Sequence, residues 1–239
     1  NFCNYQRFCQ EVPTKENLGS PWSPNIEKII GLEPQLVFMY GFSGTVKYIW
    51  SLEQAGLKVV AINAKSVNDV YRIVQMIGSI VGKEKEASTL INEAKQRLDA
   101  VANKIEITVQ KKPKVYFEWT TTLKTGGGDS FSNELIAAAG GENIFGDVKL
   151  TDLEANQEEI AYRNPDVIII QSDNKLATDA IAEGRDLWDM FLEKRPACRD
   201  VSAIINRKVY TIEGCYVTYD LLFILGVERF AQWFYPDVF

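Results

Sequence analysis

One pattern of polar, apolar and proline positions occurs twice in this chain, in residues 26–40 and in residues 157–171. Each copy has the spacing of a short helix, then a proline, then a nearly continuous apolar run of strand length. The positions shared at an offset of 131 are Glu27 and Glu158, Ile29 and Ile160, and Pro34 and Pro165. A strand that is apolar throughout is typical of a parallel sheet covered by helices on both faces. The repeat therefore predicts two similar α/β lobes.

The likeness continues beyond these segments. A helix over 44–56 and a strand over 58–63 follow the first copy, and a helix within 176–195 and a strand over 208–213 follow the second. The order strand, helix, strand is that of a βαβ unit. A chance likeness between two α/β segments is the alternative, but the shared glutamate, isoleucine and proline at one offset argue against it.

Between the copies, apolar residues at helical spacing predict one helix over 84–108, with no glycine or proline inside it. At ~1.5 Å per residue this helix is a rod of roughly 37 Å. Its position indicates a connection between the lobes, and the alternative is a helix that packs on its own lobe. The predicted division is residues 1–82 for the first lobe, 83–110 for the connecting helix and 111–239 for the second lobe.

Several local signals add to this outline. Ser66 is expected to cap a helix over 67–80, and Ser23-Pro24 is expected to begin a helix after an irregular start. A strand over 114–119 leads to a glycine-rich segment around Gly126–Gly128, which lacks the Gly-Lys-Ser/Thr ending of a Walker A loop. We interpret this segment as a turn near the cleft, with Asp129 or Ser130 capping the helix that follows. A last helix over 218–234 is expected to point Leu222, Leu225, Phe230 and Trp233 inward.

The amino-acid composition argues against several classes of function. The 239 residues are 46% hydrophobic and 24% charged, as in ordinary globular proteins. The net charge of −6 and the lack of a basic stretch argue against nucleic acid as a partner. The chain has no histidine, which is the commonest metal ligand and general base, and it carries no nucleophile–base motif. We therefore expect no catalysis.

The four cysteines form two local pairs, Cys3 with Cys9 and Cys198 with Cys215. Close pairs of this kind favour disulfides and an oxidising, extracytoplasmic setting. The spacing leaves all three connectivities open, and four reduced cysteines are the alternative. Because the chain begins at Asn1 rather than at a methionine, we also expect sequence to precede it.

Four segments in order, across nearly the whole chain, resemble the substrate-binding proteins of ABC importers that carry vitamin B12, ferric siderophores and haem. They are residues 24–37, 131–144, 164–169 and 206–210. The resemblance implies an α/β fold of two Rossmann-like lobes joined by a single long helix, with a ligand cleft between the lobes. It also implies an extracytoplasmic location, in the periplasm or as a membrane-anchored lipoprotein, and a first lobe that is incomplete at its start.

Such a cleft is lined by loops at the carboxyl ends of the strands. The expected ligand-binding residues are Tyr5, Trp22, Tyr40, Phe42, Trp119, Thr120 and Tyr216. Aromatic walls suit a large flat ligand such as a corrinoid, a haem or a ferric siderophore, although each ring could instead be core packing. Lys124 and Arg163 could face an anionic ligand. We expect no resident cofactor and no metal site of the protein's own. Coordination of the ligand's metal stays open, and Tyr5, Tyr40 and Tyr216 could supply it.

The resemblance further implies a permease and its ATPase as partners, with one acid on each lobe meeting arginines of the permease. Glu53 is the candidate in the first lobe, although the absence of any acid in 41–50 departs from the family pattern. Glu183 is the candidate in the second lobe, with Asp173 and Asp179 as alternatives. Solvated surface charge is the alternative for both. The protein is expected to be a monomer.

The alternative function is an enzyme or a metal-cluster assembly protein on a similar two-lobed scaffold. Disulfides, rather than cysteines that serve as metal ligands, would favour the importer.

Overall fold

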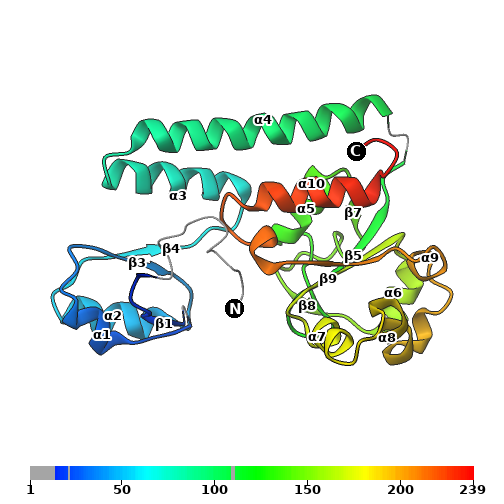
Figure 1. Cartoon of the computed structure of the whole chain (residues 1–239), viewed down its shortest axis with the longest axis horizontal. Helices are drawn as coiled ribbons and strands as arrows, with labels where there is room; N and C mark the ends of the chain where they lie inside the picture. Colours follow the sequence, from blue (N-terminus) through cyan, green and yellow to red (C-terminus); the bar gives the residue numbers. More distant parts are fainter. Residues whose placement is uncertain (1–13, 21, 109–110) are drawn as a thin grey trace. The chain divides into compact units, whose positions relative to one another are not determined.

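The computed structural model describes residues 14–20, 22–108 and 111–239 (Figure 1). The described residues form two compact units that divide between Ala64 and Lys65. We call the part up to Ala64 the small unit and the part from Lys65 to Phe239 the large unit. The predicted division at residues 82 and 110 stays a prediction, and the two helices after residue 65 belong to the large unit.

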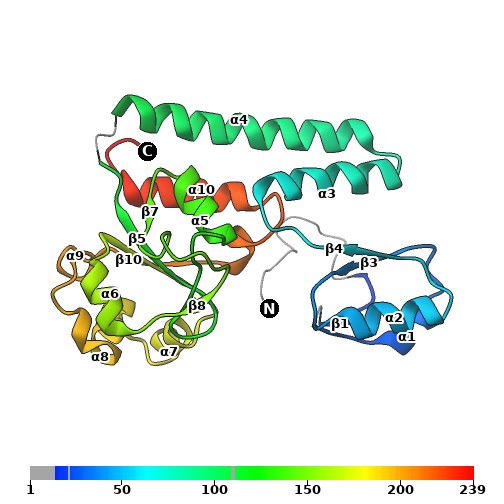
Figure 2. The ribbon, with the colours of Figure 1, turned by 180° about the vertical axis from the view of Figure 1, so that it is seen from behind.

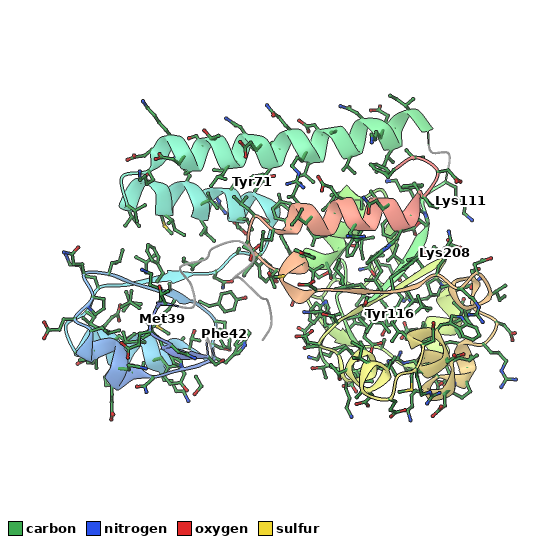
Figure 3. All side chains as sticks on the ribbon, in the orientation of Figure 1. Met39, Phe42, Tyr71, Lys111, Tyr116 and Lys208 are labelled. Atoms are coloured by element: carbon green, nitrogen blue, oxygen red, sulfur yellow. The ribbon has the colours of Figure 1, made fainter. Side chains whose placement is uncertain are left out.

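The small unit is built on a parallel pair of strands. β3 (Val37–Tyr40) pairs with β4 (Val59–Ile62), and α2 (Val46–Gln54) connects them, as the βαβ pattern predicts. A short antiparallel pair, β1 (Gly19–Ser20) and β2 (Ser23–Pro24), precedes α1 (Ile26–Gly31). The core consists of Ile29, Met39 and Leu52, and Figure 3 labels Met39 within it.

Two expectations for the small unit are wrong. Ser23-Pro24 does not begin a helix but lies in β2, and the first helix is capped by Asn25, whose Oδ1 accepts a hydrogen bond from the Lys28 amide at 2.9 Å. β3 is also not buried on both faces. Met39 faces the core formed with α1 and α2, whereas Phe38, on the opposite face, is 37% exposed.

The large unit contains a four-stranded parallel sheet in the order β10–β9–β5–β7. The strands are β5 (Lys114–Glu118), β7 (Glu142–Asn143), β9 (Val167–Gln171) and β10 (Val209–Ile212). Every residue of β9 is buried, as its apolar run predicts. A separate antiparallel pair joins β6 (Lys124–Thr125) to β8 (Leu153–Glu154).

Helices cover both faces of this sheet. One face packs on α6 (Gln157–Arg163), α7 (Lys175–Ala182) and α8 (Leu187–Lys194), around Tyr116, Ile168 and Phe191. The other face contacts α10 (Phe223–Phe234), where the ring centroids of Phe117 and Phe230 are 6.1 Å apart. The large unit also contains α5 (Phe131–Ala138), η3 (Pro196–Cys198), α9 (Ser202–Ile205) and η4 (Gly214–Val217).

The long helix α4 (Glu84–Thr108) has the predicted bounds. It lies beside α3 (Val67–Ile80) and α10, as Figures 1 and 2 show from opposite sides. Arg97 of α4 and Glu228 of α10 form a two-point ion pair at 2.7 and 2.6 Å. The described residues include no helix that is both long enough and apolar enough to cross a membrane.

The repeat and the caps are confirmed by the structure. Ile29 and Ile160, which occupy the same position in the two copies, are both buried in their helices. Ser66 caps α3 in a reciprocal capping box with Asp69. These features were therefore predictable from local sequence spacing.

The later helices differ from the prediction. Residues 176–195 form two helices, because Gly184 takes a positive φ of 63° and Asp186 caps a second helix. The last helix begins at Phe223 instead of residue 218, since residues 218–222, after η4, form bends and a turn. Its buried face consequently includes Phe223 and Val227, while Leu222, Leu225 and Trp233 are half-buried.

Candidate functional site

Three of the predicted ligand residues form an aromatic cluster in the small unit. The ring of Trp22 lies 4.8 Å from that of Phe42 and 5.8 Å from that of Tyr40, both edge to face. Tyr40 and Phe42 are 5.5 Å apart. The Trp22 side chain is 60% exposed, while the other two are half-buried, so the cluster presents ring surface to solvent. We call these three residues the aromatic trio.

The local chain geometry explains why the trio forms. Tyr40 ends β3, and Phe42 follows in the turn before α2, where Figure 3 labels it. Thr45, which is fully buried, donates its hydroxyl to the Tyr40 carbonyl at 2.6 Å, and its oxygen accepts from the Phe42 amide at 3.1 Å. Trp22 lies in the turn between β1 and β2. Burial raises the pKa of the Tyr40 phenol.

The other predicted ligand residues lie in the large unit or outside the described residues. Trp119 is half-buried and Thr120 is exposed, both directly after β5, and Tyr216 is half-buried in η4 after β10. They thus occupy the carboxyl ends of parallel strands, where ligands bind in α/β sheets. Tyr5 lies outside the described residues.

A buried polar network holds the end of β5. The Glu118 carboxylate, fully buried, accepts from the Tyr116 hydroxyl at 2.9 Å, from Asn174 Nδ2 at 3.1 Å and from Arg195 Nη2 at 2.7 Å. Burial and the Glu118 charge raise the pKa of the Tyr116 phenol. Asn174 also donates to the carbonyl of Trp119, so the network fixes the backbone there.

Sequence reasoning missed this network. Arg195 and Asn174 are distant from Glu118 along the chain, so no local pattern links them. The one available signal was Glu118 itself, a carboxylate that ends an otherwise apolar strand. A charge at a buried strand position needs partners, and the structure supplies them from three elements.

The glycine-rich segment is a turn, as predicted. The Gly128 amide donates to the Val148 carbonyl at 2.7 Å, and a Cβ on Gly127 would lie 2.6 Å from the carbonyl oxygens of Val148 and Leu150. These glycines are therefore required by a close approach of two backbone segments. Ser130 caps α5, accepting from the Asn133 amide at 3.1 Å.

The two cations expected to face an anionic ligand make ion pairs within the large unit. Arg163 pairs with Asp147 at 2.7 Å and with Glu159 at 3.1 Å, which raises the pKa of its guanidinium. Lys124 pairs with Asp152 at 2.7 Å. Whether either side chain also faces an anionic ligand stays a prediction.

The predicted docking acids are both on the surface. Glu53 is exposed near the end of α2. Glu183 is exposed after α7, with a carboxylate oxygen 3.5 Å from Arg185. Their role in docking stays a prediction.

The cysteines do not all form disulfides. Cys215 is disulfide-bonded, whereas Cys198 is free and fully buried in the core beneath α6–α8, so the prediction is wrong for Cys198. Its Sγ lies 3.5 Å from the Gln157 carbonyl, and burial raises the pKa of its thiol to about 11. Cys3 and Cys9 lie outside the described residues. Within the described residues, no group of three or more Cys, Asp or Glu side chains could hold a metal ion.

This chain is similar in sequence to known proteins. The family description "Periplasmic binding protein" matches residues 1–215. An "Uncharacterized ABC transporter substrate-binding lipoprotein YvrC" from Bacillus subtilis is 30% identical over 97% of this chain and 71% of its own length. A "Cobalamin-binding protein" from Halobacterium salinarum is 31% identical over 63% of this chain, which spans only 41% of that relative. A "Vitamin B12-binding protein" from Salmonella paratyphi A is 24% identical over 70% of this chain and 62% of its length.

Solved structures agree in fold. A possible iron-binding, periplasmic solute-binding protein from Staphylococcus epidermidis superposes with a TM-score of 0.73 at 26% identity, covering 90% of this chain and 82% of that one. A periplasmic haem-binding protein from Pseudomonas aeruginosa reaches a TM-score of 0.82 at 18% identity, covering 98% and 83%. With the parallel α/β architecture and the family match, these findings lead to one conclusion. The chain belongs to the periplasmic binding protein family and is an extracytoplasmic solute-binding protein.

Proposed function

We propose that this protein captures a large, flat metal complex, in the first place a corrinoid, and delivers it to the permease of an ABC importer. The observation that carries the proposal is the aromatic trio. Its rings lie within 5.8 Å of one another, and Trp22 remains 60% exposed. Clustered aromatic faces bind broad apolar ligands, and rings that are already held in place lose little entropy on binding.

The relatives favour a corrinoid. Two of those that share sequence with this chain are named as cobalamin-binding and vitamin B12-binding proteins. An iron complex, such as haem or a ferric siderophore, is the second candidate, supported by the similarity to a possible iron-binding protein at 26% identity. In both cases the metal arrives as cargo, and the protein itself needs no resident cofactor.

The residues of the large unit that we propose as further ligand contacts are Trp119, Thr120 and Tyr216, and Tyr5 is proposed with them. Their positions at strand ends support this assignment. Trp119 is held at its carbonyl by Asn174 and at its amide by the Lys124 carbonyl, 2.9 Å away. A fixed backbone keeps this indole ready for a ligand.

For delivery, we propose that Glu53 and Glu183 contact arginines of the permease, whose ATPase then drives import. Their exposure and charge support the proposal, because surface carboxylates steer association with a basic partner. Capture and release are the whole of the activity that we propose, and the protein acts as a monomer.

The test is a titration of tryptophan fluorescence with cobalamin, haem and a set of ferric siderophores. We expect saturable quenching by cobalamin that is weakened in Trp22→Ala. The matched control is Trp50→Ala, which removes an indole that is 62% exposed on α2 and outside the trio. A folded protein that responds to none of these compounds would contradict the proposal, and a response to haem alone would select the second candidate.

A further inference from the structure

Helix α2 of the small unit presents two large apolar side chains to solvent. The inner side of α2 packs on the core, with Leu52 fully buried and Ile49 against it, and the helix contacts α1 and β4 (Figure 1). Val46 and Trp50 lie one turn apart on the outer side, where they are 60% and 62% exposed. We call these two residues the α2 pair. Core packing does not account for it.

The α2 pair is also separate from the aromatic trio. The ring contacts that define the trio join Trp22, Tyr40 and Phe42 and do not include Trp50. Single exposed apolar side chains are common on protein surfaces and need no explanation. A tryptophan beside a second exposed apolar residue on one helix face is different, because tryptophan is enriched among the residues that dominate the binding energy of protein interfaces. The α2 pair is therefore a candidate contact with another protein.

The charges of α2 indicate what kind of partner fits. Glu53 is the one acid of this helix, and it is exposed, seven residues after Val46 and three after Trp50. Residues at these spacings share one face of a helix. An apolar pair with an acid at its edge fits a protein surface that carries apolar side chains and arginines. An anionic lipid surface attracts clustered cations instead, and α2 has the single cation Lys47.

We propose that the α2 pair is the apolar anchor with which the small unit docks on the permease, and that Glu53 lies at the edge of this contact. The inference rests on the proposed delivery of cargo to an ABC importer, and it names the residues that supply the affinity. Segment 41–50 has no acid and contains the α2 pair, so an apolar contact takes the place of the charged one expected there. Buried aromatic anchors dominate the binding energy of an interface, whereas charges at its edge mainly speed association.

The large unit has the same combination of an acid and an exposed apolar side chain. Ile181, near the end of α7, is 74% exposed and precedes Glu183 by two residues. Glu183 is the acid proposed to dock from this unit, so both proposed docking acids have a large, exposed apolar neighbour within one helical turn. This second instance, in a different unit, supports a docking contact that is apolar with an acid beside it.

The experiment measures binding of the protein, without cargo, to the permease–ATPase complex of the importer in lipid nanodiscs, by surface plasmon resonance at low and at high salt. Trp50→Ala should raise Kd at least about tenfold at both salt concentrations, mainly through faster dissociation. Glu53→Gln should slow association at low salt and have little effect at high salt. The matched control is Leu32→Ala, which removes a side chain that is 50% exposed directly after α1 of the same unit and should leave Kd unchanged.

Several results would overturn the proposal. They are Trp50→Ala binding the complex as tightly as Leu32→Ala does, a loss of binding confined to low salt, and no binding of the wild-type protein beyond that to empty nanodiscs. A wild-type dimer in analytical ultracentrifugation that Trp50→Ala abolishes would assign the α2 pair to a second copy of the chain and overturn it as well. Because the assay uses protein without cargo, a failure of cobalamin capture appears only in the fluorescence titration and is distinguishable from a failure of docking.

Discussion

Glu118→Ala should destabilise the large unit strongly. The variant leaves the Arg195 guanidinium, only 3% exposed, without its counter-charge, and it also removes the acceptor for Tyr116 and Asn174. Removing one partner of a buried ion pair costs about 3–5 kcal/mol of unfolding free energy. For a chain of this size each kcal/mol lowers Tm by about 2–4 °C, so the melting temperature should fall by roughly 6–20 °C. Urea unfolding followed by circular dichroism measures the first quantity, and a thermal scan measures the second.

The double variant Glu118→Leu/Arg195→Met separates the pair from its surroundings. Replacing both charges by apolar groups removes the uncompensated guanidinium, so the double variant should be more stable than Glu118→Ala. It should remain below the wild type by about 1–3 kcal/mol, because Tyr116 and Asn174 still lose an acceptor. A cost below about 1 kcal/mol for Glu118→Ala, or a double variant less stable than Glu118→Ala, would refute the description of the network.

Three further predictions concern packing, thiol chemistry and pH. Leu52→Ala, at a fully buried position in the core of the small unit, should cost about 2–5 kcal/mol and speed hydrogen exchange in β3 and β4. Alkylation followed by mass spectrometry should modify Cys198 only after denaturation, because its thiol is buried with a pKa raised to about 11, and should modify Cys215 only after reduction. A hydrogen bond from the Lys65 amide contributes most to lowering the pKa of Asp69 to about 2. The stability that the charged Asp69 carboxylate gives to the folded state is therefore fully present above the ordinary pKa of aspartate and is lost as pH falls towards 2. Asp69→Asn should remove that part of the acid sensitivity in urea titrations between pH 2 and 6, and an unchanged profile would contradict it.

The features that could be predicted from the sequence depend on residues close together in the chain. The bounds of α4 follow from an apolar stripe without glycine or proline, and Ser66 and Ser130 cap their helices by contacts three residues away. The repeat likewise predicted β3–β4 and β9–β10 as parallel pairs, because each copy has its own helix, proline and strand. The three residues of the trio were predicted as members of a larger aromatic set that lines a cleft, and the structure places these three rings together.

The features that it missed depend on residues far apart in the chain. Arg195 forms an ion pair with Glu118, which is distant along the chain. Cys198 packs in the core beneath α6 instead of forming a disulfide, and the spacing of the cysteines did not show which of them would pair. The ion pairs of Arg163 with Asp147 and of Lys124 with Asp152 were not predicted, because these partners lie 16 and 28 residues away along the chain. The pair of Arg163 with Glu159 has local i,i+4 spacing and could have been predicted. The sequence pattern shows which side chains are charged or apolar, whereas the tertiary fold decides which of them contact each other.

The central claim is that the aromatic trio binds the cargo, and calorimetric titration with cobalamin of two alanine variants tests it most directly. Phe42→Ala removes a ring from the trio, and Trp50→Ala removes an exposed indole outside it. An aromatic anchor contributes about 1–2 kcal/mol to binding, so Phe42→Ala should raise Kd roughly 5- to 30-fold while Trp50→Ala leaves it unchanged. Equal Kd values for the two variants, or no heat of binding in folded wild-type protein, would contradict the account.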